Sequence, residues 1–406
     1  LKKMKFRKLK TNKNFFLKMF IDLKKKKLTQ KLNLKKLNKL YDYIIIGSGP
    51  ASSVLLNNLL KIKKKILVIE RGGFEKLSTT NIVSDDLQIK KTSRNFGVGG
   101  TSNTWSQIYS LLTKTEMKNL ENKNIWPLSH KDLTKWCKKV GSKYKFNLNQ
   151  IGSELIYKNK FYLRKFIENK YPLRFSKYFI KDKKKFDMIT NCKVQFIDET
   201  KKFSSIFFTF EKQIHSIKSK KIIICAGGIE SNLLILNSLK NRYLKNLKNK
   251  KFIGRFFMDH PKCYIGEIKY PKKNLIQKIK LQYKERVNMY SGISLFKENQ
   301  RTLNTYVRFE EKKKFFNLKK KMMLRIFLEM EPRFKNRIYI KNKINKVDLS
   351  ISRKEIEISK KLLNEILQIF SYKPQNEKIE FNQKNLIGAS HHMGGLCYPK
   401  IVDKNL

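Results

Sequence analysis

Acidic residues and cysteines are scarce in this chain, and long apolar runs are missing from it. The 406 residues include 32 Asp and Glu against 92 Lys and Arg, so the formal net charge is +60. The five cysteines lie far apart and form no CxxC pair, which argues against a disulfide framework or a metal site and for a reducing compartment. No stretch approaches the roughly 18 uninterrupted apolar residues of a membrane-spanning helix.

The positive charge has two interpretations. Such a chain attracts polyanions, either nucleic acid or the anionic surface of a membrane. Alternatively, codon composition accounts for it, because the abundant Lys, Asn, Ile and Phe all have A/T-rich codons. The lysines are spread along the chain and do not form one stripe, which favours codon composition. We therefore expect a cytoplasmic protein without a nucleic-acid partner, and we leave open a peripheral contact with the inner face of the membrane.

A β-α-β unit is predicted at the start of the ordered chain, after a basic extension over residues 1–40. The run from Tyr43 to Ile46 is apolar throughout, which is typical of a strand buried on both faces. A helix is expected from about Ala51 to Leu60, followed by a second buried strand from Ile66 to Ile69 that ends in Glu70. This order predicts an α/β fold with a Rossmann-like domain.

The rest of the chain changes character along its length. Residues 130–190 are expected to be helical, and strands at 194–197, 206–210 and 222–225 lead into a helix at 229–236. Alternating strands at 337–340 and 347–351, with an amphipathic helix at 355–370, predict a second, α+β domain built on an antiparallel sheet.

A dinucleotide site is predicted at the turn of the β-α-β unit. Gly47 permits a tight turn, Gly49 lets the backbone approach a pyrophosphate, and the helix N-terminus attracts that anion. Glu70 ends the next strand, where a carboxylate can accept the hydroxyls of a ribose. Ser52 stands where the motif has its third glycine. The candidate contacts are Gly47, Gly49, Pro50, Ala51, Ser52, Glu70 and Arg71.

Several motifs, in their family order, give the chain a resemblance to the glucose-methanol-choline oxidoreductases. After the β-α-β unit, these motifs are GVGGTSNTW at 97–105, WPLS at 126–129, ICAGGIES at 224–231, Gly254-Arg255 with DHP at 259–261, and SHHMGG at 390–395. The resemblance spans about 41–262 and 386–406, and the pyranose-oxidase and fructose-dehydrogenase branch looks closest.

The resemblance implies that FAD is the cofactor and that a CH–OH group of an alcohol or sugar is oxidised. A hydride would pass to flavin N5 while His391, matched to the family's HxxG segment, takes the hydroxyl proton. His392 would point away or support the loop. Thr104 stands where some relatives carry a flavin-attaching histidine, so noncovalent FAD is expected. The further cofactor contacts that it implies are Gly99, Gly100, Thr101, Ser102, Asn103, Trp105, Val194, Ala226, Gly227 and Asp403.

The resemblance also implies a domain plan. The FAD-binding domain would comprise 41–135 and 188–262, with a substrate-domain or lid insertion at 136–187. The substrate domain would be 263–385, and 386–406 would begin a C-terminal catalytic segment. A second catalytic His or Asn is expected beyond Leu406, so a polypeptide limited to these residues would bind FAD weakly.

The sequence alone leaves three points open. The electron acceptor can be oxygen, a quinone or a cytochrome. His260 either approaches the active site or is a buried structural histidine. A basic membrane-peripheral or nucleic-acid-binding protein, or an inactive fragment, could reuse the same dinucleotide fold.

Overall fold

The computed structural model describes residues 37–402 apart from 38, 76, 85, 119–120, 122, 124–125, 145–152, 157–160, 170–171, 182–184, 201, 246, 270–286, 296–302, 304, 312–320, 370–380 and 399. Residues 1–36 of the predicted basic extension, and Asp403, lie outside the described residues. The chain forms two compact units. The first comprises 1–79, 95–100 and 175–226, and the second comprises 80–94, 101–174 and 227–406.

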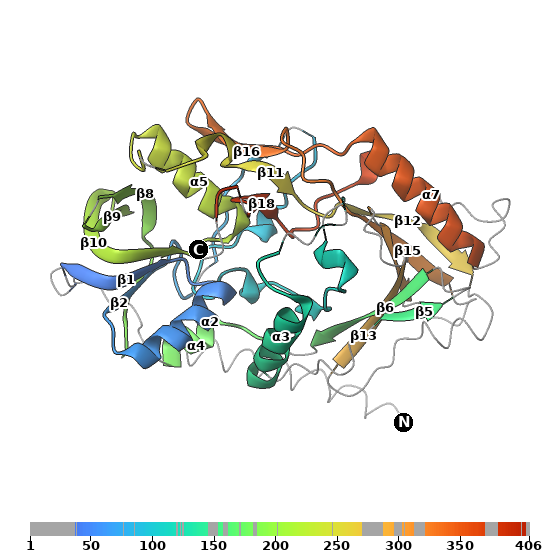
Figure 1. Cartoon of the computed structure of the whole chain (residues 1–406), viewed down its shortest axis with the longest axis horizontal. Coiled ribbons are helices and arrows are strands. Elements are labelled where there is room, and N and C mark those ends of the chain that lie inside the picture. The colour runs from blue at the N-terminus through green and yellow to red at the C-terminus, as the bar shows by residue number, and fades with distance from the viewer. Residues whose placement is uncertain are drawn as a thin grey trace, which may run out of the picture. The chain divides into compact units, whose positions relative to one another are not determined.

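A six-stranded sheet with a parallel centre forms the first unit (Figure 1). Its order is β7-β2-β1-β10-β9-β8, and β1 pairs in parallel with both β2 and β10. The strands are β1 (Leu40–Ile46), β2 (Ile66–Ile69), β7 (Asp187–Ile189), β8 (Lys193–Glu199), β9 (Ser204–Phe210) and β10 (Gln213–Ile224).

The apolar runs seen in the sequence make the core of this unit. All of β2 is buried, as are Ile44 to Ile46 of β1. Leu56 of α2 (Pro50–Leu59) packs with Ile45 and Val68, and Phe179 of α4 (Ser176–Lys181) joins the same cluster. The predicted β-α-β unit is therefore present, and the Rossmann-like fold class is confirmed.

Mostly antiparallel strands, together with longer helices, build the second unit (Figure 1). The exception is β3, which pairs in parallel with β17. A seven-stranded sheet runs β12-β15-β14-β13-β6-β4, with β5 added to β6, and a five-stranded sheet runs β18-β11-β16-β17-β3. The first comprises β4 (Ile108–Tyr109), β5 (Ser153–Ile156), β6 (Phe161–Asn169), β12 (Lys262–Lys269), β13 (Val287–Leu295), β14 (Thr305–Glu311) and β15 (Lys321–Leu328). The second comprises β3 (Val83–Ser84), β11 (Arg255–Met258), β16 (Arg337–Lys341), β17 (Ile344–Asp348) and β18 (Met393–Gly395). The longer helices that the structure describes in this unit are α3 (His130–Tyr144), α5 (Gly227–Lys240) and α7 (Arg353–Ile369).

The strands of the seven-stranded sheet alternate between a core face and a half-exposed face. Cys263, Val307 and Ile326 point into the core with Ile366 of α7. The residues between them along β12, β14 and β15 are partly exposed, as the two-residue period of a strand requires. A bulge between Tyr264 and Gly266 interrupts the ladder of β12 with β15.

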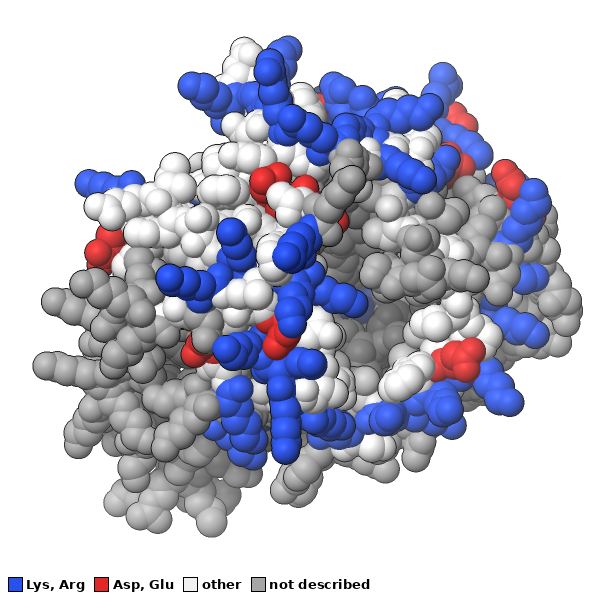
Figure 2. All heavy atoms as spheres, turned by 60° about the vertical axis from the view of Figure 1, so that its left-hand side comes forward, with Lys and Arg blue, Asp and Glu red and all other residues white. Residues whose placement is uncertain are grey.

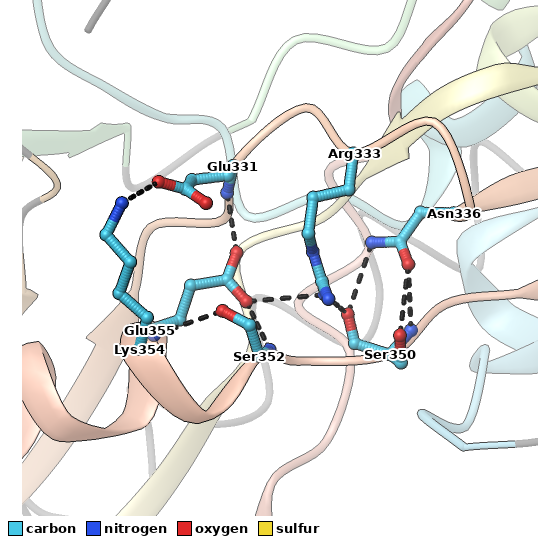
Figure 3. A network of polar contacts seen from close by, with 7 residues as sticks. All are labelled: Glu331, Arg333, Asn336, Ser350, Ser352, Lys354 and Glu355. Atoms are coloured by element: carbon cyan, nitrogen blue, oxygen red, sulfur yellow. Dashed lines mark hydrogen bonds and ion pairs between the residues drawn. The ribbon is translucent and has the colours of Figure 1, made fainter.

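A polar network fixes the start of α7 (Figure 3). Ser352 Oγ accepts the Glu355 N–H at 3.1 Å, and the Glu355 carboxylate accepts the Ser352 N–H, which is a capping box. The same carboxylate accepts the Glu331 N–H at 2.6 Å and pairs with Arg333 at 3.3 Å. Glu355 therefore ties the helix to the chain that follows β15.

The expectation of helices throughout 130–190 was wrong. α3 and α4 are helical, but β5, β6 and β7 are strands. β6 pairs along its whole length with β13, more than 100 residues later in the chain. Pairing with a distant strand thus outweighed the local pattern.

Basic side chains are spread over the surface seen in Figure 2. Lys and Arg form several groups across the face in Figure 2, with Asp and Glu among them. In the part of the chain that the structure describes, no helix has both the length and the apolar character needed to cross a membrane.

Candidate functional site

The turn between β1 and α2 needs glycine at its first position. The Gly47 N–H donates to Ile69 O at 2.8 Å, and the Cys225 N–H donates to Ile46 O at 2.8 Å. The turn therefore sits between the ends of β2 and β10. Gly47 has φ +96°, and a Cβ there would lie 2.5 Å from Cys225 O. A side chain would collide with the neighbouring strand.

The N-terminus of α2 is open to an anion. Gly49 is its N-cap with no side-chain hydrogen bond, Pro50 occupies the first turn, and no acidic residue lies there. A Cβ on Gly49 would meet no atom within 4 Å. The Ser52 hydroxyl is buried and has no hydrogen-bond partner, and Ala51 is exposed. Free helix N–H groups, open space and an unsatisfied hydroxyl fit the diphosphate of a dinucleotide.

Glu70 is buried at the end of β2 and accepts four hydrogen bonds. Its Oε2 accepts the Ser48 N–H at 2.9 Å and the Ser48 hydroxyl at 2.6 Å. Its Oε1 accepts the N–H groups of Gly72 at 2.9 Å and Gly97 at 3.1 Å. Burial raises the pKa of the carboxyl, and the hydrogen bonds from Ser48, Gly72 and Gly97 oppose that rise.

In this conformation the acceptor positions of Glu70 are taken by the protein itself. The carboxylate joins the glycine turn, the end of β2 and the 97–100 segment. Its predicted contact with a ribose stays a prediction and would need some of these bonds to be exchanged. Arg71 lies 3.9 Å from the Phe96 ring centroid. Val194 lies two residues after Cys192, whose N–H donates to Glu70 O at 3.0 Å.

The GVGGTSNTW segment is held by the backbone at its start. The Gly99 N–H donates to Ser48 O at 3.0 Å. Gly100 has φ +53°, and a Cβ there would lie 3.1 Å from the Gly49 Cα. The segment therefore contacts the glycine turn within the first unit.

The remainder of that segment, in the second unit, is tied to the chain around residue 174. The short 3-10 helix Gly100–Asn103 leads into it, and the Trp105 N–H donates to Thr101 O at 3.0 Å. The Trp105 indole N–H donates to Leu173 O at 2.9 Å. Arg174 donates to Trp105 O at 3.0 Å and also to the carbonyl of buried Ser102.

The chain between β10 and α5 contains Gly227, the remaining glycine among the predicted cofactor contacts. Ala226 follows Cys225, and Gly227 begins α5 with φ +83°. A Cβ at Gly227 would meet no atom within 4 Å. Like Gly49, it leaves open space at the start of a helix.

A buried carboxylate organises the histidine segments of the second unit. Asp259 is 1% exposed. Its Oδ1 accepts the N–H groups of His260 at 2.8 Å and His391 at 3.1 Å, and its Oδ2 accepts the Ser390 N–H at 3.1 Å. One side chain therefore fixes the DHP and SHH segments, which are far apart in the sequence.

These segments bring two imidazoles into contact. His260 Nε2 and His391 Nδ1 form a hydrogen bond, and the ring centroids are 4.4 Å apart. Burial, and next the neighbouring His391, lower the pKa of His260 to about 4. His391 keeps part of its surface exposed, and the partial burial of its ring lowers its pKa as well. Both rings are therefore neutral at pH 7, with one nitrogen donating and the other accepting.

His392 turns to the other side of the same loop. Its side chain is 7% exposed, its Nε2 lies 3.9 Å from Asp259 Oδ2, and its ring lies 5.8 Å from that of Phe257. Burial lowers the pKa of this imidazole too. A Cβ on Gly228 would lie 2.9 Å from His392 O, so α5 packs closely behind the loop.

Comparison with known proteins identifies the fold. The chain matches no protein-family model and no curated protein sequence. Pyridoxine 4-oxidase from Mesorbium loti superposes with a TM-score of 0.55 at 12% identity, over 89% of this chain and 90% of that one. A fungal aryl-alcohol oxidase gives 0.53 at 11% identity, over 82% and 83%. The chain shares the fold of both oxidases.

Sequence reasoning named most of these residues but not how they combine. His260 was left between two roles, and the structure places it against His391. Asp259 was noted only as part of a motif. Its one sequence signal is an acidic residue beside a histidine, which does not reveal a contact with residues 390–391. Among the described residues, no group of three or more His, Cys, Asp or Glu is arranged to hold a metal ion.

Proposed function

We propose that this chain is an FAD-dependent oxidoreductase of the glucose-methanol-choline type that oxidises a CH–OH group of a small alcohol or sugar. The observation that carries the proposal is the hydrogen-bonded His391–His260 pair, whose backbone Asp259 holds. The open glycine turn of the first unit, and the fold shared with pyridoxine 4-oxidase and aryl-alcohol oxidase, support it.

The chain's own residues would handle the proton. His391 is the proposed base: a neutral imidazole can accept a hydroxyl proton at pH 7, and a pKa lowered by burial keeps it neutral. His260 would orient that ring and take part of the positive charge through their shared hydrogen bond. Asp259 is a positioning residue, because it holds the backbone of both histidines. When bound, FAD supplies N5 as the hydride acceptor.

The proposed cofactor contacts follow from the first unit. The α2 N-terminus would hold the diphosphate, with Gly47 and Gly49 allowing close approach. Glu70 would contact the ribose. We propose noncovalent attachment because Thr104 cannot form the linkage of a histidine. Yellow colour that stayed with the polypeptide after acid denaturation would contradict this.

Flavin reduction by alcohols tests the function directly. Protein loaded with FAD should bleach at the flavin bands when sugars and primary alcohols are added without oxygen. His391→Gln should slow that reduction by about 100- to 10,000-fold, the usual contribution of a general base. His215→Gln, on β10, serves as a matched control. If none of the alcohols reduces the flavin, or if His391→Gln reacts like the wild type, the proposal fails.

The proposal also includes an electron acceptor and a peripheral contact with the membrane, and both can be tested. Oxygen, a quinone analogue and cytochrome c, offered separately to the reduced protein, would identify the electron acceptor. Peripheral contact through the basic surface predicts sedimentation with anionic vesicles that added salt abolishes.

A further inference from the structure

The half-exposed face of the seven-stranded sheet carries cations and aromatic rings side by side. The strand registers place residues of β12, β15 and β14 opposite one another. Two neighbouring rows of this face are Lys262–Phe327–Tyr306 and Tyr264–Arg325–Arg308. The opposite face is core, so these six side chains are directed away from it.

The first row adjoins the paired imidazoles. The His260 ring lies 5.8 Å from the Phe327 ring. Lys262 Nζ lies 5.7 Å and Arg308 Cζ lies 5.5 Å from the centroid of the same ring. The Phe327 ring therefore lies beside His260, which is hydrogen-bonded to His391, and beside two cations. A substrate held over Phe327 would reach both.

The pKa of Lys262 reflects the positive charge gathered around it. Burial first, and then Lys90, Arg325 and Arg308, lower the pKa of Lys262 to about 8. Asp259 partly offsets them, but its oxygens already accept three backbone N–H groups. Burial and the neighbouring cations thus make the charged form of Lys262 costly, and an anion bound beside its ammonium group would recover part of that free energy.

We propose that the substrate is an alcohol bearing a carboxylate or phosphate group, which binds Lys262, Arg308 and Arg325 while its hydroxyl lies at His391. This inference rests on the proposed function and names its substrate class. Arg suits either anion because its planar fork matches both in a bidentate way. The rings of Phe327 and Tyr264 would contact the carbon chain between the two ends.

The sheet also limits the length of that substrate. Successive rows on one face lie roughly 7 Å apart, so the second row with Arg325 is about one row beyond Phe327. The next row holds Glu267 of β12, opposite Met323. An acidic residue there would repel a longer anionic chain. The hydroxyl and the anion should therefore be separated by a few carbon atoms.

Matched pairs of alcohols test the inference. FAD-loaded protein is offered ω-hydroxycarboxylates of three to six carbons and the diols of equal length, and kcat/KM is measured for each. The hydroxy acid should exceed its diol by about 10- to 100-fold, the range of a charge-assisted contact. Lys262→Gln and, independently, Arg308→Gln should reduce that ratio towards one. Lys262→Arg should retain it, and Lys341→Gln, on the exposed end of β16, should match the wild type.

Calorimetric binding separates the two proposals. Butanoate and inorganic phosphate, which cannot be oxidised as alcohols, should bind the FAD-loaded protein, and Lys262→Gln should weaken that binding by about 10- to 100-fold. The two affinities show whether carboxylate or phosphate is preferred. If alcohols reduce the flavin but acids and diols react equally and neither anion binds, the anion site is refuted while the oxidoreductase stands. If neither acids nor diols reduce the flavin but anion binding depends on Lys262, the oxidoreductase proposal is refuted while the anion site stands.

Discussion

Replacing Glu70 by glutamine preserves the shape of the side chain and exchanges one acceptor oxygen for a donor group. In the wild type, Ser48, Gly72 and Gly97 direct four donors at the two oxygens. The Ser48 hydroxyl can rotate and accept instead, so the least costly orientation places the new amide group toward Ser48. The Ser48 N–H then faces a donor and loses its partner.

The magnitude follows from these contacts. A buried N–H without a partner costs about 1–3 kcal/mol, and the two bonds from Gly72 and Gly97 lose the strengthening that a charged acceptor gives. Burial raises the pKa of Glu70, which means that the carboxylate carries a desolvation cost that glutamine avoids. That saving offsets part of the loss. We expect the free energy of unfolding of the protein to fall by about 2–4 kcal/mol.

Hydrogen exchange read by mass spectrometry, together with urea unfolding, measures the effect. Peptides that cover Ser48, Gly72 and Gly97 should exchange faster in Glu70→Gln. Glu75→Gln, an exposed residue of the same unit, should change stability by less than about 0.5 kcal/mol. Unchanged exchange at all three amides in Glu70→Gln would show that the carboxylate does not hold these segments.

Three further predictions concern other parts of the chain. Gly47→Ala should destabilise the protein by about 1–3 kcal/mol because of its positive φ and the clash with Cys225 O. Gly49→Ala should leave the apoprotein's melting temperature unchanged and weaken FAD binding. Equal melting temperatures for the two variants would refute this contrast. Asp259→Asn turns an amide donor toward Ser390 or toward the two histidine N–H groups, so exchange at 390–391 should rise and flavin reduction should slow by about 10- to 100-fold; retention of both wild-type values would show that Asp259 does not position the loop. The pKa of His260 is lowered to about 4, so between that value and the usual 6.5 the unfolded chain binds more protons than the folded one. The free energy of unfolding, measured in urea, should therefore fall as the pH drops from 6.5 to 4. His260→Gln should make the free energy of unfolding depend less on pH in this range.

The parts of the fold that the sequence predicted are those with local signals. Ile44 to Ile46 and all of β2 are continuous apolar runs, and Gly47 and Gly49 mark the turn between them. Such patterns need no knowledge of distant partners. β6 has no comparable signal, because its strand state depends on the ladder with β13.

The same distinction applies to the candidate site. Histidines at 260 and 391 could be selected from the motifs, but their contact follows from the Asp259 carboxylate, which accepts from both segments. The inward orientation of Glu70 depends on the Gly97 N–H and the Ser48 hydroxyl. The row of Lys262 and Phe327 depends on how β12 and β15 are paired. A sequence motif does not specify such pairings.

Because of its bulge, β12 should tolerate the deletion of one residue at position 265 but not at position 263. Ile265 is the residue left over between the Tyr264–Arg325 and Gly266–Leu324 pairs. Its deletion would keep every other β12 residue opposite its present partner, at the expense of one buried isoleucine. Deleting Cys263 instead would shift Lys262 opposite Ile326 and turn its ammonium group into the hydrocarbon interior. Natural variants of this strand should therefore differ in length at 265 and keep constant length at 262–264.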